Sequence, residues 1–263
     1  MSTIQFSDQV TLSKTRKNEE VLCVCKDDPT LSGPSNLACR AILQWRKFTG
    51  DRTGVKVSII KRIPKMAGLG GGSSDAVATL RALNLLHGQP LRHSELLEIA
   101  EKLGSDCPFF LGNGLAQVKG KGEKVIQIPG NKKKELNGRR IFLFQPPFGF
   151  RTPLLYQLLA KESLYSNSEW AEESFQKWKN GAIPICKFLY NDFENIILRK
   201  YLFLDPLFKE LEKRFGLKFH VSGSGSSCFS FAPENLSAKQ VKDLVKKLLG
   251  ENSHFWVSRI SFN

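Results

Sequence analysis

The stretch that decides the fold is rich in glycine and reads Pro64-Lys65-Met66-Ala67-Gly68-Leu69-Gly70-Gly71-Gly72-Ser73-Ser74. The run Val55–Ile60 before it is typical of a strand, and the apolar spacing after it predicts a helix as far as Leu86. Glycine permits positive φ and lets a ligand approach the main chain closely. The first N–H groups of a helix have no partners inside the helix, and the helix dipole adds positive potential there. A strand, a glycine loop and a helix start together predict an anion site, most often for phosphate.

Two well-known phosphate loops do not fit this stretch. The pattern G-x-x-x-x-G-K-[ST] is absent, because no lysine follows the glycines. A dinucleotide-binding G-x-G-x-x-G that begins at Gly68 fails at its third glycine position, which is Ser73. A flexible turn in which a serine caps the helix needs no ligand at all. Because glycine-rich turns are common, the loop on its own does not exclude that simpler interpretation.

The length and net charge of the chain indicate which kinds of molecule it is expected to bind. The chain has 263 residues, enough for a sizeable core and one or two domains. It carries 39 Lys and Arg against 25 Asp and Glu, and this net charge of +14 favours anionic partners. The basic residues are spread out, and the densest runs, at 132–140 and 242–247, contain no interleaved aromatic residues of the kind that bind single-stranded nucleic acid. We therefore expect an anionic small molecule as partner and no nucleic acid.

The sequence also bears on location, redox state and metals. No apolar run approaches the roughly 20 residues of a membrane span, and no charged segment followed by an apolar core marks a secretory signal. We expect a cytoplasmic protein with no membrane partner. The six cysteines include no C-x-x-C pair and have mostly apolar neighbours, which favours reduced core residues. The four histidines lack metal-ligand spacing, so no residue is assigned to a metal.

The predicted elements mix strands and helices and favour an α+β fold. The first two strands, Gln9–Ser13 and Val21–Cys25, are expected to form a hairpin. The lysine-rich segment 130–137 is expected to be an exposed loop. Helices are predicted at 37–48, 73–86, 93–103, 152–160, 167–179, 206–215 and 238–249.

A change of domain is predicted in the middle of the chain. A buried-type strand ends near residue 144 and a loop with two prolines follows, so we predict two domains, 1–145 and 146–263. The second domain contains another glycine loop between two predicted strands, Ser222-Gly223-Ser224-Gly225-Ser226-Ser227. Small residues let this backbone touch a ligand, although an ordinary strand connection would have the same composition.

A candidate catalytic base lies between the two loops. Phosphoryl transfer needs a cradle for the phosphates, charge neutralisation and a base for the acceptor hydroxyl. Asp106 sits just after a predicted helix and just before an apolar run, in Gly104-Ser105-Asp106-Cys107-Pro108-Phe109-Phe110. A carboxylate poised between solvent and core has a tunable pKa and orientation. An aspartate that accepts hydrogen bonds from N–H groups of its own turn also explains the residue, and from the residues alone this structural role is favoured.

The two glycine loops and the Asp106 segment together resemble the GHMP small-molecule kinases, with matches in order along nearly the whole chain. The first loop has the pattern P-x-x-x-G-L-G-G-G-S-S-D-A at residues 64–76. Its triple glycine is similar to the branch of the family that phosphorylates 4-diphosphocytidyl-2-C-methyl-D-erythritol, whereas homoserine and mevalonate kinases usually have G-L-G-S-S-A. Softer matches are N-L-x-x-[RK]-A from Asn36, T-P at Thr152 and N-D-[FL]-E from Asn191.

The resemblance implies a two-domain GHMP kinase fold, with an N-terminal domain like domain 2 of ribosomal protein S5 and a ferredoxin-like C-terminal domain. It implies transfer of the γ-phosphate of ATP, with Mg²⁺, to the 2-hydroxyl of that substrate in the non-mevalonate isoprenoid pathway, by a monomer or a homodimer. Asp106 would be the catalytic base, and the residues from Pro64 to Ser74 would hold ATP. The residues that would border the phosphates are Gly223, Ser224, Gly225 and Ser226. An aromatic wall for cytosine would come from Phe150, Phe188 or Tyr190.

One family segment has no counterpart in this sequence. It is a first strand with P-A-K-[LV]-N-L, whose lysine pairs with the catalytic aspartate, followed by R-x-D-G-[YF]-H. Ile4, Asp8 and Val10 fit the segment that comes next in the family. We therefore expect an exposed sheet edge. We favour a start codon assigned too late, which the genomic sequence upstream of Met1 would reveal.

Two rival functions stay open at this point. A shortened, impaired or inactive homologue that binds nucleotide without catalysis would also lack the first strand. Another GHMP kinase, with homoserine or mevalonate as its substrate, is the nearest rival among active enzymes.

Overall fold

The chain forms two compact units, and the computed structural model describes residues 1–120, 122 and 124–262. The first unit consists of Met1–Pro64, Gly70–Glu135 and a short C-terminal piece that begins at Ser261. The second unit consists of Lys65–Leu69 and Leu136–Ile260. The glycine loop is therefore divided, because its first half belongs to the second unit and its second half belongs to the first.

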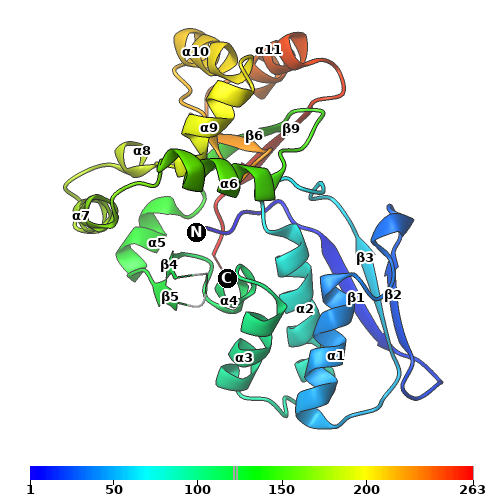
Figure 1. Cartoon of the computed structure of the whole chain (residues 1–263). Helices are drawn as coiled ribbons and strands as arrows, with labels where there is room; N and C mark the ends of the chain where they lie inside the picture. The colour runs from blue at the N-terminus through cyan, green and yellow to red at the C-terminus, as the bar shows by residue number, and fades with distance from the viewer. Residues whose placement is uncertain (121, 123, 263) are drawn as a thin grey trace. The chain divides into compact units, whose positions relative to one another are not determined.

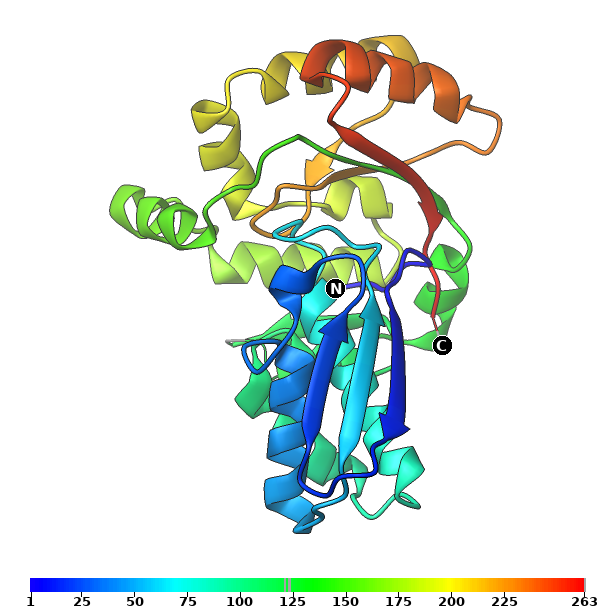
Figure 2. The same cartoon turned by 90° about the vertical axis from the view of Figure 1, so that its right-hand side faces the viewer.

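The sheet of the first unit has its strands in the order β1–β3–β2 (Figure 2), and these are β1 Gln9–Lys14, β3 Val55–Ile60 and β2 Val21–Cys25. The predicted hairpin of the first two strands is wrong, because β3 lies between them, antiparallel to β1 and parallel to β2. β2 and β3 are joined through a helix, and a crossover of this kind makes strands parallel. β3 buries Val55, Val57 and Ile59 almost completely, as a central strand should. β1 lies at an edge of this sheet and its side chains are mostly exposed.

Two helices lie side by side against one face of this sheet (Figures 1 and 2), α1 Leu37–Thr49 and α2 Gly71–Leu86. The Asn36 side chain accepts a hydrogen bond from the N–H of Ala38 at 2.8 Å and so caps α1. The first unit also contains η1 Pro29–Leu31, α3 His93–Leu103 and the short α4 Cys107–Leu111. The core beneath them is apolar and includes Ile42, Trp45, Leu80, Leu83 and Ile99.

The lysine-rich segment is a helix, which corrects the prediction of an exposed loop there. It is α5, Gly130–Leu136, and it follows an antiparallel pair of short strands, β4 Ala116–Lys119 and β5 Lys124–Gln127. The Lys132 side chain is buried, and its ammonium lies 2.7 Å from a carboxylate oxygen of Glu135, one helical turn away. A lysine can bury its apolar stem when its charged end finds a partner, so a polar composition does not exclude a packed helix.

The sheet of the second unit is fully antiparallel in the order β7–β8–β6–β9, and its strands are β6 Arg140–Gln145, β7 His220–Val221, β8 Cys228–Phe231 and β9 His254–Arg259. β6 pairs with both β8 and β9, so it belongs to the second unit. The long segment of that unit begins at Leu136, before β6. The division into domains 1–145 and 146–263 stays a prediction.

Six helices complete the second unit, namely α6 Thr152–Glu162, α7 Ser168–Lys179, α8 Ile185–Phe188, α9 Asp192–Lys200, α10 Leu204–Phe215 and α11 Ala238–Leu249. Figure 1 shows α10 and α11 over one face of the sheet. The core between them and the sheet is apolar and includes Phe142, Phe144, Leu211, Phe219 and Val241. Both units combine helices with a largely separate sheet, which confirms the α+β prediction.

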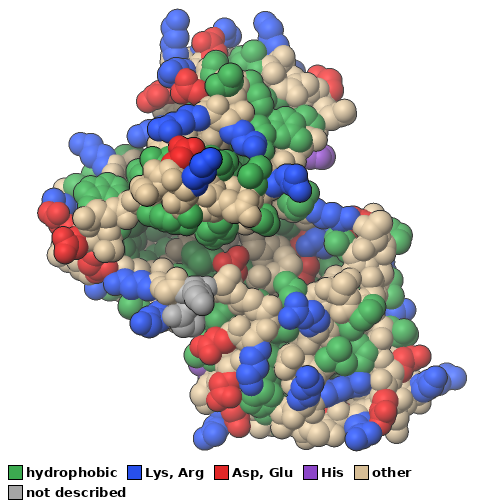
Figure 3. Space-filling view, viewed as in Figure 1, with side chains coloured by type: hydrophobic (Ala, Val, Ile, Leu, Met, Phe, Trp, Pro, Cys, Tyr) green, Lys and Arg blue, Asp and Glu red, His purple; other side chains and the backbone are tan. Residues whose placement is uncertain are grey.

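The surface and the cysteines agree with the composition. On the face drawn in Figure 3, Lys and Arg side chains are scattered among Asp and Glu and do not gather into one patch. All six cysteines are free thiols, and all except Cys186 are buried. Within the described residues, none of the helices has the length and apolar character that a membrane crossing requires.

Candidate active site

The two glycine loops recognised in the sequence contact each other inside the second unit. The N–H of Ser226 donates to the carbonyl of Met66 at 3.1 Å, and the N–H of Ser227 donates to the carbonyl of Ala67 at 3.0 Å. The hydroxyl of Ser222 donates to the carbonyl of Gly68 at 2.8 Å, across 154 residues of sequence. The first half of one predicted motif is thus bound directly to the other predicted motif.

Glycine is required where these loops meet. Gly68 has φ +70°, and a Cβ there would overlap the Ser222 carbonyl oxygen and lie 2.8 Å from that of Gly225. Gly225 has φ +79°, and a Cβ there would overlap the ring of Phe150. A larger residue at Gly68 would force the two loops apart, and a larger residue at Gly225 would displace the ring of Phe150.

Phe150 is therefore unavailable as an aromatic wall for cytosine, and that prediction is wrong. Its side chain is 2% exposed and its ring stacks on that of Tyr201 with the centroids 4.3 Å apart. The ring fills the space that the missing side chain of Gly225 leaves open. Phe188 stacks on Trp178, and Tyr190 is half exposed, so these two stay predictions.

The second half of the first loop begins α2 in the first unit. Gly70 is the N-cap residue, with φ +66°, and no side chain of the described residues caps this end. Ser74 does not serve as a cap, because its hydroxyl donates to the carbonyl of Gly71 at 2.8 Å. The first turn also contains no acidic residue. An uncapped first turn built from glycine and serine suits an anion such as a phosphate, so the residues present fit the phosphates of ATP.

Asp106 lies beside this helix start. It directly precedes α4, which contacts the loop in two ways. The Ser73 side chain lies beside the Cys107 thiol, and a Cβ on Gly70 would lie 2.9 Å from the ring of Phe110. The Asp106 carboxylate does not cap α4, which removes the simplest structural explanation for it. Although the side chain is exposed, desolvation by the surrounding protein raises the pKa of its carboxyl.

Three charged residues at the ends of the first loop were missed by the sequence analysis. The Lys61 ammonium forms ion pairs with Asp8 and with Asp75, where the distance to Oδ2 is 2.9 Å. Burial raises the pKa of the Asp75 carboxyl to about 6, against the lowering effect of Lys61. Burial alone would lower the pKa of Lys61, but the two carboxylates outweigh it and raise that pKa. The signal in the sequence is that Lys61 and Asp75 stand just outside the two ends of the loop.

The N-D-F-E match also has a physical role, which the sequence analysis did not assign. The Asn191 side-chain amide donates to the carbonyls of Val221 and Gly223, both at 2.8 Å. The Glu194 carboxylate accepts from the N–H of Val221 at 2.7 Å. Both residues thus hold the second glycine loop and the strand that leads into it. The T-P match contributes as well, because the Thr152 and Ser224 hydroxyls are hydrogen bonded at 2.8 Å.

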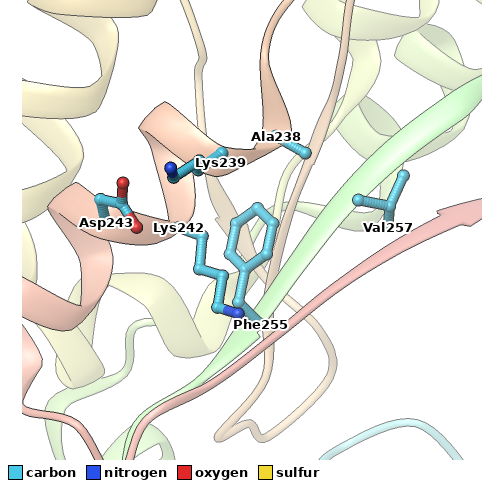
Figure 4. A pocket seen from close by; sticks show the side chains of 6 residues that line it. All are labelled: Ala238, Lys239, Lys242, Asp243, Phe255 and Val257. Atoms are coloured by element: carbon cyan, nitrogen blue, oxygen red, sulfur yellow. The ribbon is translucent and has the colours of Figure 1, made fainter.

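The described residues offer no better candidate for a functional site than the glycine loops and Asp106. No group of three or more His, Cys, Asp or Glu side chains in the described part of the chain is placed to hold a metal ion. A separate hollow of about 450 Å³ lies between α11 and β9 (Figure 4), lined by Ala238, Lys239, Lys242, Asp243, Phe255 and Val257. It contains neither a glycine turn nor a pair of carboxylates, so we assign it no chemistry.

Comparison with known proteins agrees with this geometry. The GHMP kinases N terminal domain matches residues 36–114, and the GHMP kinases C terminal domain matches residues 169–250. A 4-diphosphocytidyl-2-C-methyl-D-erythritol kinase from Desulfitobacterium hafniense is 31% identical over 98% of this chain and 85% of its own length. A kinase of the same name from Geobacter sulfurreducens is 29% identical over 94% of this chain and 84% of its own length.

Two solved structures that superpose on this chain are also kinases. The crystal structure of a 4-(cytidine 5'-diphospho)-2C-methyl-D-erythritol kinase superposes with a TM-score of 0.70, at 28% identity, covering 99% of this chain and 88% of that one. A homoserine kinase from Cytophaga hutchinsonii superposes with a TM-score of 0.69 at 19% identity, covering 98% of this chain and 88% of that one, and shows the shared fold alone. By its two domains and its relatives, the chain belongs to the GHMP kinase family, within the branch of the 4-diphosphocytidyl-2-C-methyl-D-erythritol kinases.

Proposed function

We propose that this chain is an ATP-dependent kinase of the non-mevalonate isoprenoid pathway, which phosphorylates the 2-hydroxyl of 4-diphosphocytidyl-2-C-methyl-D-erythritol. The observation that carries the proposal is the direct contact between the two glycine loops, through hydrogen bonds from Ser222, Ser226 and Ser227 to the first loop. Two loops with close backbone approach suit a polyphosphate better than a single capped turn does. The identity of the acceptor substrate is inferred from the names of the two relatives.

The phosphates of ATP are assigned to the loop from Pro64 to Ser74. The uncapped first turn of α2 offers N–H groups and positive dipole potential to the anion. The residues from Gly223 to Ser226 border the phosphates from the second loop. A Mg²⁺ ion that arrives with ATP would neutralise charge on the β- and γ-phosphates, with hydroxyl oxygens such as that of Ser73 as the hard ligands it prefers.

Asp106 is assigned the role of the base. The 2-hydroxyl oxygen of the acceptor attacks the γ-phosphorus, and the bond from that phosphorus to the β–γ bridging oxygen breaks. ADP leaves, and the Asp106 carboxylate takes the hydroxyl proton. This carboxylate is not used as a cap for α4, and it stands beside the start of α2. Because desolvation raises its pKa, kcat should fall as the pH drops through that raised value and the base becomes protonated.

A coupled assay of ADP release tests this proposal with the diphosphocytidyl substrate, homoserine and mevalonate in parallel. We expect turnover with the first alone, and we expect Asp106→Asn to lower kcat by about 10³-fold, within the usual range for a general base. Asp243→Asn, an exposed carboxylate on α11, is the matched control and should leave kcat unchanged. Turnover with homoserine or mevalonate instead would contradict the substrate. Nucleotide binding without turnover on any acceptor would favour the non-catalytic binding protein.

We also propose a cytoplasmic location, with small molecules as the only partners and neither nucleic acid nor membrane among them. A monomer and a homodimer remain the two candidate states. Sedimentation velocity across a tenfold range of protein concentration separates them, because the sedimentation coefficient of a reversible dimer falls on dilution.

A further inference from the structure

Lys61 is held in an unusual environment for a lysine. It directly follows β3, its side chain is 14% exposed, and the carboxylates of Asp8 and Asp75 that face it are 1% and 5% exposed. The three residues come from the segment before β1, the end of β3 and the first half of α2. We call this group the charged clamp.

The charged clamp joins the two ends of the phosphate loop. On one side, Oδ1 of Asp8 accepts hydrogen bonds from the N–H groups of Arg62 at 2.6 Å and Ile63 at 2.8 Å, the two residues that lead into Pro64. On the other side, Lys61 binds Asp75, which follows Ser74 on α2. Every one of these contacts lies within the first unit, so the residues on either side of the loop are fixed to one another.

The ammonium of Lys61 also lies close to the helix start itself. A Cβ on Gly71 would lie 3.4 Å from Lys61 Nζ, so the charge sits beside the first residue of α2. A cation at a helix N-terminus opposes the helix dipole and does not stabilise the helix. The same cation adds to the positive potential that an anion bound at that end experiences. The placement is unfavourable for an isolated helix and favourable for bound phosphate.

A contribution to the stability of the fold does not by itself explain why these three charges are buried together. Replacing a buried set of ion pairs by neutral side chains of similar volume is often neutral or stabilising, since desolvation offsets the attraction. Breaking the set by removing one member is costly, because a charge is left buried without a partner. Buried charges of this kind fix geometry more reliably than they add stability.

We infer that Lys61 is a positioning residue of the kinase: clamped by Asp8 and Asp75, it sets the phosphate loop so that the start of α2 faces the phosphates of ATP. This inference rests on the proposed function. It concerns the binding of ATP and leaves the acceptor substrate and the base untouched. The clamp therefore acts on the KM for ATP more than on kcat.

The first test is Lys61→Met in the full chain, with steady-state kinetics and with ADP binding measured by calorimetry. We expect the KM for ATP to rise about tenfold while kcat changes less than about threefold, the pattern of a lost binding interaction. Lys61→Arg, which keeps the charge, should recover most of the affinity. Lys56→Met, the same substitution on β3, is the matched control and should leave the KM for ATP unchanged.

A second variant keeps the inference testable if Lys61→Met does not fold. In Asp8→Asn/Lys61→Met/Asp75→Asn all three charges are removed together, and the amide oxygen that replaces the Asp8 carboxylate can still accept from the N–H groups of Arg62 and Ile63. We expect this variant to fold with a melting temperature near that of the wild type and to keep the raised KM for ATP.

The outcomes separate the two proposals. A folded triple variant with the wild-type KM for ATP would show that the clamp is only structural, and would overturn this inference alone. A wild-type chain that neither binds ADP nor turns over the diphosphocytidyl substrate would overturn the proposed function, and this inference with it.

Discussion

The two halves of the phosphate loop are held by different forces. The half in the second unit, Lys65–Leu69, is fixed by hydrogen bonds from serine N–H and hydroxyl groups to its backbone carbonyls, and by steric contacts that only glycine permits. The half in the first unit, from Gly70, is flanked by the charged clamp. Substitutions in the first half should therefore change the free energy of unfolding through added volume and hardly at all through pH. The second half is also tightly packed at Gly70, but it alone should respond to charge and pH.

The largest effect on stability is expected from added volume in the first half. Gly68→Ala places a methyl group against the Ser222 and Gly225 carbonyl oxygens at a positive φ, and should lower the free energy of unfolding by about 3 kcal/mol. Gly72→Ala is the control in the same loop, because its methyl group would make an ordinary contact, 3.6 Å from Leu37. Urea unfolding of both variants measures the difference. Equal stabilities would contradict the close approach of the two loops at Gly68.

A smaller effect is expected from pH acting on the second half. The pKa of Asp75 is raised in the folded state to about 6, so its proton is held more tightly there than in the unfolded chain. The stability from this group is present in full below its unfolded pKa of about 4 and is lost as the pH rises through about 6. Between pH 4 and 7 the wild type should lose about 2 kcal/mol relative to Asp75→Asn.

Urea unfolding of both proteins at several pH values measures that loss. Gly68→Ala, whose change carries no charge, should instead differ from the wild type by the same amount at every pH. A constant difference between the wild type and Asp75→Asn across this range would contradict the raised pKa.

The smallest effect is expected at the support of the second glycine loop. Asn191→Ala removes two hydrogen bonds to backbone carbonyls and the bond that caps α9, which the Asn191 side chain accepts from the N–H of Phe193. It should reduce the free energy of unfolding by about 1–2 kcal/mol. The KM for ATP should rise about threefold, because the loop that we propose to border the phosphates loses an anchor. Asn195→Ala, one turn further along α9, is the matched control and should leave both quantities near their wild-type values. A loss of stability with an unchanged KM would restrict Asn191 to a role in folding.

The sequence was most informative where local chemistry decides the outcome. The first loop could be recognised because its glycine pattern, the preceding strand and the following helix are contiguous, and the structure indeed starts α2 at Gly71. Asp106 was found for the same reason, since it lies in a short segment between a helix and an apolar run. Their functional roles remain predictions that the assays above address.

Long-range pairing was less predictable. The order β1–β3–β2 depends on the crossover through α1, and strands that are adjacent in sequence suggested a hairpin instead. The charged clamp escaped notice because Asp8, Lys61 and Asp75 come together only after the sheet has formed. Phe150 was misjudged because an aromatic residue in a loop suggests a ligand, and nothing local shows that Gly225 rests on its ring.

The interleaving of the two units along the chain has a consequence for recombination between homologous genes. A chimaera joined after Glu135 would take Lys65–Leu69 from one parent and the loop of Ser222–Ser227, against which it packs, from the other. The two loops are in such close contact at Gly68 that a second loop of different shape would not fit against the first. Active chimaeras should therefore take residues 65–69 and 136–260 from the same parent, even though 66 residues of the other unit lie between these segments.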